Sequence, residues 1–556
     1  MKDFNVVISG AAGEGVQTIG DVLADTVSAH GYAVFTWQEY ESRIRGGQNR
    51  YSIRIGEATR NAPLEMADIL LALNHGALAK YAPLLKKDGT LLAEEPVRER
   101  MIAVPFTQIA RDELGDKIYA NTIALGALVA TAGIELNGLQ QTLMRQFADK
   151  GDRIVQANLA AAEKGYRFAR ERCQDMCPWQ LPKRTGQTFL IAGNEAIPIA
   201  AAHAGCRFIS AYPMTPSTGI ITFLAREQQL GIFTEQAEDE IAAINMAIGA
   251  SYAGVRAMTA TSGGGFALMV EGVSLAGMTE TPVVIVLAQR PGPATGLPTR
   301  TAQGELLFAI NAGHGEFPKL VLAPSDPKDA FHKMVRAFDL ADKYQIPVIV
   351  LTDQFLADSR FTIEDFELEK LTPTPYLAHP SDMEHYLRYQ LTTNGISPRL
   401  YPGQSEHLVG ADSDEHDAAG HITEDLAKTV VANVEKRIAK LNNLKREVKP
   451  PEATFLEGAD EVLVGWGSSR EAIQEGCDLL REAGVKAGAL HFTELWPLPD
   501  YAFPVGKSYW TVESNATGQL ARLLRSEYGL SFAGSITRVD GLPLTGDYIR
   551  RCFHDH

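Results

Sequence analysis

A carboxylate at the start of a predicted helix is the first candidate for chemistry. The acidic run Glu235–Glu240 leads into a stripe of Ile241, Ile244 and Ile248 at helical spacing. Acidic residues at a helix N-terminus also simply favour the helix dipole. Glu240, however, lies at the edge of the apolar stripe, one turn before Ile244. Partial burial there would raise the pKa of its carboxyl, which suits proton exchange with a ring nitrogen.

A stiff loop offers a hydroxyl group at the end of a predicted strand. Tyr212–Thr218 directly follows the strand-like Phe208–Ser210, and ligands of α/β proteins bind at the carboxyl ends of strands. Prolines on both sides of Thr215 restrict the loop, so this threonine could hold its hydroxyl at a fixed position for a substrate oxygen. The alternative is a structural role, in which Ser217 or Thr218 caps the following helix.

Two arginines could bind a carboxylate near the same place. Arg290 and Arg300 lie in the Pro- and Gly-rich loop Gln289–Thr301, which follows the strand-like Val283–Leu287. Guanidinium groups held by such a loop are suited to carboxylate recognition. A single arginine is more often a solvated surface residue. Two arginines expected at the same sheet edge as Thr215 favour the binding role.

Two glycine-rich segments connect predicted strands to predicted helices. Ser262–Gly265 would let a flat ring or a backbone approach closely, although an ordinary tight turn explains it equally well. Gly10–Gly15 could present backbone N–H groups and a helix N-terminus to an anion. Its glycine spacing differs from the dinucleotide-binding fingerprint, so a structural turn is again the alternative.

Composition narrows the class of protein. A chain of 556 residues is too long for one hydrophobic core, and its formal net charge of -16 argues against nucleic-acid binding. No apolar stretch reaches the ~20 residues of a membrane span, and the N-terminus lacks a signal sequence. We therefore expect a cytoplasmic protein that binds neither nucleic acid nor membrane. The five cysteines are scattered and are expected to be free thiols, without a metal site.

The order of predicted elements indicates several domains. Strands alternate with helices, which is typical of α/β proteins with doubly wound parallel sheets. We place one α/β domain at residues 1–182 and a second at residues 187–361. Residues 362–455 are rich in Pro, Asp, Glu and His and are predicted to form an extended insert, with a charged helical arm over Thr423–Lys449. A last α/β domain is expected at residues 456–556.

Four segments, taken in order, resemble the α subunit of 2-oxoacid:ferredoxin oxidoreductases. They are Ala211–Ser217, Glu238–Ser251, Thr259–Gly263 and Gly296–Thr301. Gly10–Gly15 together with Ser42–Gly47 resembles the γ subunit of that family, here fused in front, and Ile396–Gly403 is similar to the family's middle region. Two departures are Met214, where isoleucine is commoner, and Gly264, where proline is frequent.

The resemblance implies a fold and a reaction. Residues 1–182 would be a γ-type domain, residues 187–361 a thiamine-diphosphate pyrimidine-binding domain, and residues 456–556 a transketolase C-terminal-like domain. The family converts a 2-oxoacid, coenzyme A and oxidised ferredoxin to an acyl-CoA, carbon dioxide and reduced ferredoxin, and some members run the reverse reaction.

The resemblance also implies residue roles. Glu240 would hydrogen-bond the aminopyrimidine ring of thiamine diphosphate, with Glu238 as the second choice. Thr215 would contact the substrate oxygens, and Arg290 and Arg300 are both candidates for the anchor of the substrate carboxylate. The further residues expected to bind the cofactor are Tyr212, Pro213, Ser262 and Gly263.

Features missing from the sequence imply a partner. The family's diphosphate and Mg²⁺ segment and its cysteines for a 4Fe-4S cluster are not found here, and in this family both lie on a β subunit. The active site would therefore form between this chain and a β subunit, in a dimer of αβ pairs that reduces ferredoxin.

Fewer features of the sequence indicate the substrate than indicate the family. The fused chain and the two arginines favour 2-oxoglutarate, because its second carboxylate needs an extra cation. Pyruvate or a branched-chain 2-oxoacid is the alternative substrate. A non-catalytic scaffold and a nicotinamide-dependent oxidoreductase using Gly10–Gly15 are the alternative functions. The four candidate residues Thr215, Glu240, Arg290 and Arg300 argue against the scaffold, and the glycine spacing argues against the nicotinamide enzyme.

Overall fold

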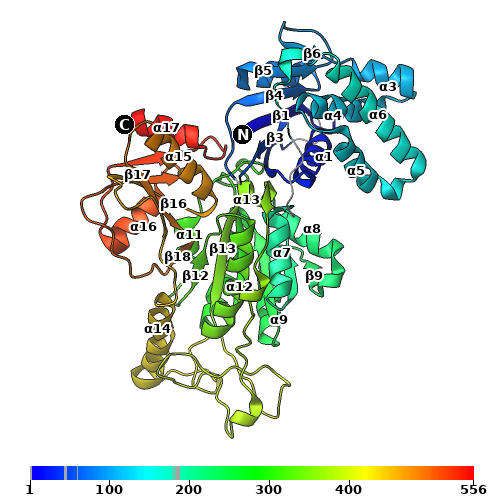
Figure 1. The fold of residues 1–556 in the computed structure, drawn as a ribbon. Coiled ribbons are helices and arrows are strands. Elements are labelled where there is room, and N and C mark those ends of the chain that lie inside the picture. The colour runs from blue at the N-terminus through cyan, green and yellow to red at the C-terminus, as the bar shows by residue number, and fades with distance from the viewer. Residues whose placement is uncertain (1–2, 43–46, 59, 180, 182–187, 556) are drawn as a thin grey trace. The chain divides into compact units, whose positions relative to one another are not determined.

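The chain forms two compact units in a computed structural model that describes residues 3–42, 47–58, 60–179, 181 and 188–555. The first unit comprises Met1–Ile191 and Ser359–Glu364, and the second comprises Ala192–Asp358 and Asp365–His556 (Figure 1). Most of the predicted motif Ser42–Gly47 therefore lies outside the described residues.

An eight-stranded sheet forms the centre of the first unit, in the order β6-β5-β4-β1-β3-β2-β14-β7. Strands β1, β4, β5 and β6 are parallel to one another, whereas β3 runs antiparallel to both β1 and β2. Only eight residues connect β2 to β3, and so short a connection produces an antiparallel pair. The strands span Phe4–Ala11 (β1), Ala33–Glu39 (β2), Gln48–Gly56 (β3), Ala67–Ala72 (β4), Leu85–Ala93 (β5), Met101–Ala103 (β6), Phe189–Ala192 (β7) and Arg360–Ile363 (β14).

The helices of this unit pack closely where glycine replaces a side chain. A Cβ on Gly126 would collide with the backbone of Ala162, and one on Gly165 would collide with the backbone of Ile123, so α4 and α6 touch along their backbones. The helices span Val16–Ala29 (α1), His75–Tyr81 (α2), Phe106–Leu114 (α3), Ala120–Thr131 (α4), Leu136–Gln146 (α5) and Asp152–Arg170 (α6).

The prediction that all cysteines are free thiols is wrong for one pair. Cys173 and Cys177 form a disulfide, with their Cα atoms 5.2 Å apart. A short 3-10 segment just after α6 turns the chain between them and brings the two sulfur atoms together. Cys206, Cys477 and Cys552 are free.

A seven-stranded sheet forms the centre of the second unit, in the order β18-β12-β13-β11-β10-β8-β9. All neighbours are parallel except β12 and β18. These strands are nearly all short apolar runs buried on both faces, as central parallel strands are. They span Cys206–Ala211 (β8), Phe233–Gln236 (β9), Arg256–Thr261 (β10), Val283–Gln289 (β11), Leu320–Leu322 (β12), Pro347–Asp353 (β13) and Glu494–Trp496 (β18).

Helices connect these strands and cover the sheet (Figure 1). Asp239 caps one of them, because its carboxylate accepts a hydrogen bond from the N–H of Ala242 at 2.7 Å. The helices span Gly193–His203 (α7), Thr218–Arg226 (α8), Glu240–Tyr252 (α9), Gly263–Met278 (α10), Leu306–Ile310 (α11), Pro327–Tyr344 (α12) and Gln354–Asp358 (α13).

A third, five-stranded sheet completes the second unit, in the order β15-β17-β16-β19-β20. It shares one hydrophobic core with the seven-stranded sheet, and β18, which follows β17 in the chain, pairs with β12 of that sheet. Three mainly parallel sheets with covering helices confirm the predicted α/β class. The elements span Glu452–Thr454 (β15), Glu461–Trp466 (β16), Ala487–Phe492 (β17), Ser508–Glu513 (β19), Gly534–Thr537 (β20), Arg470–Glu482 (α15), Gln519–Tyr528 (α16) and Gly546–Asp555 (α17).

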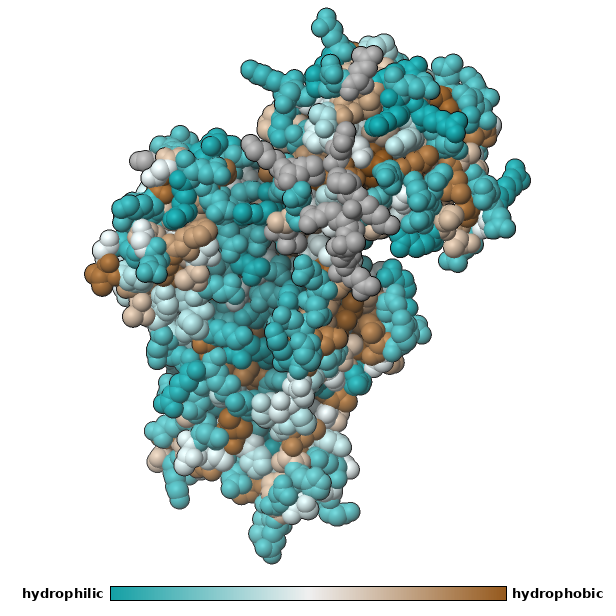
Figure 2. All heavy atoms as spheres, viewed as in Figure 1, coloured by the Kyte–Doolittle hydropathy of each residue, from teal (hydrophilic) through white to brown (hydrophobic). Residues whose placement is uncertain are grey.

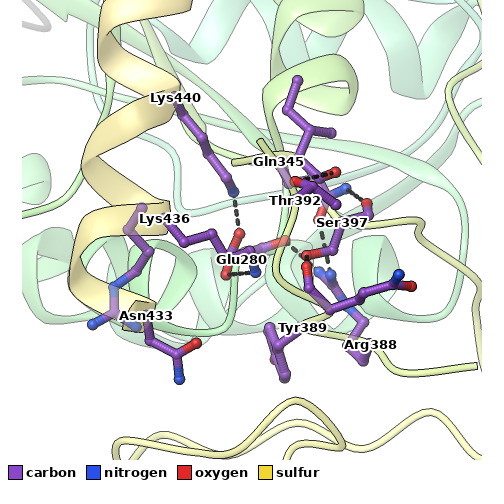
Figure 3. Close-up of polar contacts among 12 residues, drawn as sticks. Glu280, Gln345, Arg388, Tyr389, Thr392, Ser397, Asn433, Lys436 and Lys440 are labelled. Atoms are coloured by element: carbon purple, nitrogen blue, oxygen red, sulfur yellow. Dashed lines mark hydrogen bonds and ion pairs between the residues drawn. The ribbon is translucent and has the colours of Figure 1, made fainter. Parts of the chain in front are cut away.

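The insert between the second and third sheets is mostly irregular and ends in helix α14, Val431–Lys445, which follows a π-helical turn at Leu426–Val430. The predicted helix over Thr423–Lys449 is therefore shorter at both ends. Unexpectedly, α14 turns its cations inward. The buried Glu280 accepts hydrogen bonds from Lys436 at 2.8 Å and from Lys440, and Arg388 donates to the Glu280 carbonyl at 2.6 Å (Figure 3).

Candidate active site

Three neighbouring parallel strands place most of the predicted residues at one edge of the seven-stranded sheet. The Tyr212–Thr215 loop follows β8, Ser262 and Gly263 follow β10, and Arg290 follows β11. These strands are adjacent in the order β11-β10-β8, and the carboxyl ends of parallel strands meet at one edge. The sheet therefore brings together residues that are far apart in the sequence.

Burial separates the two candidate glutamates. Glu240 begins helix α9 and is only 4% exposed, whereas Glu238 is exposed. The helix dipole favours a negative charge at that position. The Oε1 atom of Glu240 is enclosed and has no hydrogen-bond partner in the part of the chain that the structure describes. Its position supports Glu240 over Glu238 as the residue that meets a ligand.

A glycine makes room for the Glu240 carboxylate. A Cβ placed on Gly265 would lie 2.7 Å from Glu240 Oε1 and would also collide with the Thr261 hydroxyl. Such distances are shorter than real Cβ contacts, so any side chain at Gly265 would displace one of these groups. The third glycine of the segment Ser262–Gly265 is therefore explained by the close approach of Glu240.

The Thr215 loop is tied directly to one of the two arginines. Arg290 Nη1 donates a hydrogen bond to the Thr215 carbonyl oxygen at 2.6 Å. The expected cap of helix α8 is wrong for Ser217, because its hydroxyl donates to the Met214 carbonyl at 2.7 Å and makes no cap hydrogen bond. This bond tightens the loop before the helix begins, so the serine fixes the Thr215 loop instead.

Arg300 lies in a different setting. Its side-chain stem packs against Gly541, whose absent Cβ would lie 2.9 Å from the Arg300 Cβ. The next residue, Thr301, donates its N–H to the Gly541 carbonyl at 3.2 Å. Arg290 is therefore bonded to the Thr215 loop, and the side-chain stem of Arg300 packs on the loop after β20.

The remaining predicted cofactor contacts are unequal in burial. Tyr212 is 39% exposed and Pro213 is half-buried, so both are accessible at the sheet edge. Ser262 is fully buried, and its hydroxyl has no hydrogen-bond partner among the described residues. Gly263 is half-buried at the first position of helix α10.

Sequence reasoning missed one acidic residue at this edge, Glu305. A Cβ on Gly263 would lie 2.6 Å from Glu305 Oε1, which shows how closely the carboxyl approaches the glycine segment. Burial raises the pKa of the Glu305 carboxyl to about 7, although the charge of Arg290 opposes the rise. The available signal was a lone acid directly before the apolar Leu306 and Leu307, in the same connection as both arginines.

The residues present fit the aminopyrimidine part of thiamine diphosphate. A buried carboxylate oxygen or hydroxyl without a hydrogen-bond partner is costly, and Glu240 Oε1 and Ser262 Oγ are two such atoms. A polar heteroaromatic ring would satisfy both atoms. Among the described residues, no group of three or more His, Cys, Asp or Glu side chains could hold a metal ion.

Comparisons with known proteins decide the family. A family model described as "Pyruvate flavodoxin/ferredoxin oxidoreductase, thiamine diP-bdg" matches residues 199–436, and one described as "Pyruvate ferredoxin/flavodoxin oxidoreductase" matches residues 5–168. The 2-oxoacid:ferredoxin oxidoreductase subunit alpha of a Sulfolobus species is 32% identical over 97% of this chain and 95% of its own length. The chain belongs to the 2-oxoacid:ferredoxin oxidoreductase alpha subunits. This confirms the family resemblance drawn from the motifs.

Two further members of this oxidoreductase family resemble the chain over nearly its full length. The 2-oxoglutarate oxidoreductase subunit KorA of Mycobacterium tuberculosis is 30% identical over 98% of this chain and 91% of its own length. A solved 2-oxoglutarate:ferredoxin oxidoreductase from Magnetococcus marinus, with 2-oxoglutarate, coenzyme A and succinyl-CoA bound, is 32% identical. It superposes with a TM-score of 0.93 and covers 100% of this chain and 99% of that one.

No helix in the described residues is long and apolar enough to cross a bilayer. The face seen in Figure 2 is largely hydrophilic, with small scattered groups of hydrophobic side chains, which is ordinary for a folded protein.

Proposed function

We propose that this alpha subunit, paired with a β subunit, oxidatively decarboxylates 2-oxoglutarate with coenzyme A. The products would be succinyl-CoA, carbon dioxide and reduced ferredoxin, and the reaction could run in either direction. The observation that carries the proposal is the buried Glu240, with an unpartnered Oε1, beside the sheet edge that holds Thr215 and Arg290. A structural carboxylate would have satisfied its oxygen atoms within the chain.

In the proposed site, each residue of this chain has a distinct task. When bound, thiamine diphosphate supplies a nucleophilic carbon for the keto carbon of the substrate. Glu240 holds a proton at a ring nitrogen, which a carboxylate kept away from water can do strongly. The Thr215 hydroxyl positions the substrate oxygen, and Arg290 or Arg300 anchors the carboxylate.

Several groups are proposed to come from other chains. Mg²⁺ and a 4Fe-4S cluster would lie on the β subunit, as the family resemblance implies. Ferredoxin would accept the electrons, coenzyme A would accept the acyl group, and the assembly would be cytoplasmic.

The preference for 2-oxoglutarate rests on charge and on the relatives. Two arginines follow β11 in one connection, and a dicarboxylate needs more positive charge than a monocarboxylate. The relatives from Mycobacterium tuberculosis and Magnetococcus marinus both carry 2-oxoglutarate in their names. Pyruvate and branched-chain 2-oxoacids are the competing substrates.

The decisive experiment combines this chain with its β subunit under strict exclusion of oxygen. Reduction of a viologen dye is followed with 2-oxoglutarate and with pyruvate, each with and without coenzyme A. We expect 2-oxoglutarate to support reduction that depends on coenzyme A. In Glu240→Gln, which keeps the shape and removes the charge, kcat should fall by about 10²- to 10⁴-fold, the usual contribution of a proton-transferring group.

Glu238→Gln is the matched control, because Glu238 is exposed and precedes the same helix. It should keep kcat within about twofold of the native value. Full activity in Glu240→Gln would contradict the assigned role. If the native complex fails to reduce the dye with every 2-oxoacid tested, the non-catalytic scaffold would be favoured instead.

A further inference from the structure

The backbone around Glu305 is held by two glutamine side chains, one on each side. Its N–H donates to Gln289 Oε1 at 3.1 Å, and Gln289 directly precedes Arg290 at the end of β11. On the other side, Gln519 Nε2 donates to the Gly304 carbonyl at 2.6 Å, while its Oε1 accepts from the Leu307 N–H at 2.9 Å. The backbone around Glu305 is therefore fixed relative to the strand end that carries Arg290.

The Glu305 carboxyl lies against the glycine-rich segment Ser262–Gly265. Oε1 lies against Gly263, and Oε2 is enclosed with no hydrogen-bond partner among the described residues. An ionised carboxylate in such a place is unfavourable. Burial accordingly raises its pKa to about 7. The guanidinium of Arg290 donates its hydrogen bond to the Thr215 carbonyl.

The charged groups around Glu305 can be named element by element. Arg290, at the end of β11, is the one whose charge lowers the pKa of Glu305. Glu240 comes from α9 to Gly265, on the same glycine segment as Gly263. Glu513, at the end of β19, is turned into the start of α16, where it accepts from the Leu520 N–H at 2.8 Å. The first turns of α10 and α11 present no charged side chain.

We propose that Glu305 is a positioning residue that competes with the carboxylate of the 2-oxoacid for the charge of Arg290, and that it becomes more fully protonated when the substrate binds. The proton comes from solvent to the Glu305 carboxyl, and no bond in the substrate changes. The inference rests on the proposed function, and it names Arg290 as the arginine that senses the substrate carboxylate.

The direction of the pH dependence follows from these charges. Below about pH 7, Glu305 is neutral and the full charge of Arg290 attracts the substrate. Above that pH, Glu305 is ionised, it partly neutralises Arg290, and the affinity for the anion falls. A pKa that rises by about one unit on binding corresponds to about a tenfold change in affinity.

The test uses the complete complex with its β subunit and compares native protein with Glu305→Gln, Glu305→Asp and the control Glu271→Gln, an exposed residue of α10. The KM and kcat for 2-oxoglutarate are measured from about pH 6 to about pH 8.5. Native KM should rise about tenfold across this range while kcat changes little. Glu305→Gln should have a low KM that no longer depends on pH in this way, and Glu305→Asp should restore part of the dependence.

A second readout does not need turnover. Titration calorimetry of 2-oxoglutarate on the complex without thiamine diphosphate and coenzyme A, in two buffers of different ionisation enthalpy, counts the protons taken up on binding, because no decarboxylation can follow. Native protein and Glu271→Gln should take up a fraction of a proton near pH 7, and Glu305→Gln should take up none. The Asp variant keeps the comparison available if the Gln variant does not fold.

The outcomes separate the role of Glu305 from the proposed function. Native turnover of 2-oxoglutarate with a KM that depends on pH identically in Glu305→Gln would overturn the role of Glu305 and leave the proposed function standing. Native binding without proton uptake would do the same. Failure of the native complex to bind or turn over any 2-oxoacid would overturn the proposed function, and this inference with it.

Discussion

Glu240 owes its position to an absent side chain. Its carboxylate occupies space that any residue larger than glycine at position 265 would take, and a Cβ there would lie 2.7 Å from Oε1. The catalytic candidate and the glycine therefore form one unit, although they belong to different helices, α9 and α10. A purely structural turn would place no such demand on its neighbour.

At the residue scale, Gly265→Ala should impair catalysis more than folding. The methyl group would push the Glu240 carboxylate away from its position, and a misplacement of about 1 Å costs up to about 100-fold in rate. Dye reduction by the complex with its β subunit measures the loss. The control is Gly249→Ala on α9, where an added Cβ would meet no atom within 4 Å. Equal activity in the two variants would argue against the close approach as the reason for the glycine.

The sequence predicted several of these residues, but it could not predict which of them are buried or which residues they contact. The run before α9 contained both Glu238 and Glu240, but only the fold shows that one is exposed and the other buried. Glu305 was missed because its importance depends on Gly263, which is distant along the chain and close in space. Patterns of residue type report which face a side chain occupies, and they do not report which neighbour it meets.

At the scale of an element, helix α14 reverses the usual pattern. A charged helix in an insert is expected to expose its lysines, yet α14 buries Lys436 and Lys440 around Glu280 and exposes Val431 and Val434. The sequence could not indicate this arrangement, because Glu280 lies 156 residues before Lys436. Although burial alone would raise it, the two lysines and Arg388 hold the pKa of Glu280 well below its usual range.

Glu280→Gln should therefore destabilise the second unit strongly. The substitution leaves two buried ammonium groups without their counter-charge, and breaking a buried ion pair in this way costs about 3–5 kcal/mol. Chemical denaturation monitored by circular dichroism measures the loss. Glu435→Gln, on the exposed face of the same helix, should change the free energy of unfolding by less than about 0.5 kcal/mol. A similar small effect for both variants would show that the cluster contributes nothing to stability.

At the scale of the whole molecule, the chain enters the first unit twice. After adding β13 to the seven-stranded sheet, it returns as β14, which pairs with β2. Thr362 secures the return, because its hydroxyl accepts from the Val34 N–H at 2.7 Å and donates to the Val34 carbonyl at 2.8 Å. The predicted boundary at residue 361 falls inside this strand. The sequence of a short strand does not indicate which sheet the strand will join.

Thr362→Val should loosen this edge of the first sheet. The variant keeps the shape of the side chain but leaves the buried Val34 N–H and carbonyl unsatisfied there, at a cost of about 1–3 kcal/mol. Hydrogen exchange read by mass spectrometry should show faster exchange in β2 and β14, with β1 unchanged. Thr374→Val, at an exposed position, is the control. Unchanged exchange in β2 would mean that the hydroxyl is dispensable.

Because β14 comes late in the chain but belongs to the first unit, one folded unit could be built from two separate polypeptides. If the gene were divided just before β7, the smaller product would lack β7 and β14 and would present β2 as an open sheet edge. The larger product would keep both missing strands. The two products could then reassociate by strand donation, so a lineage could gain or lose a subunit here without redesigning a surface between folded bodies.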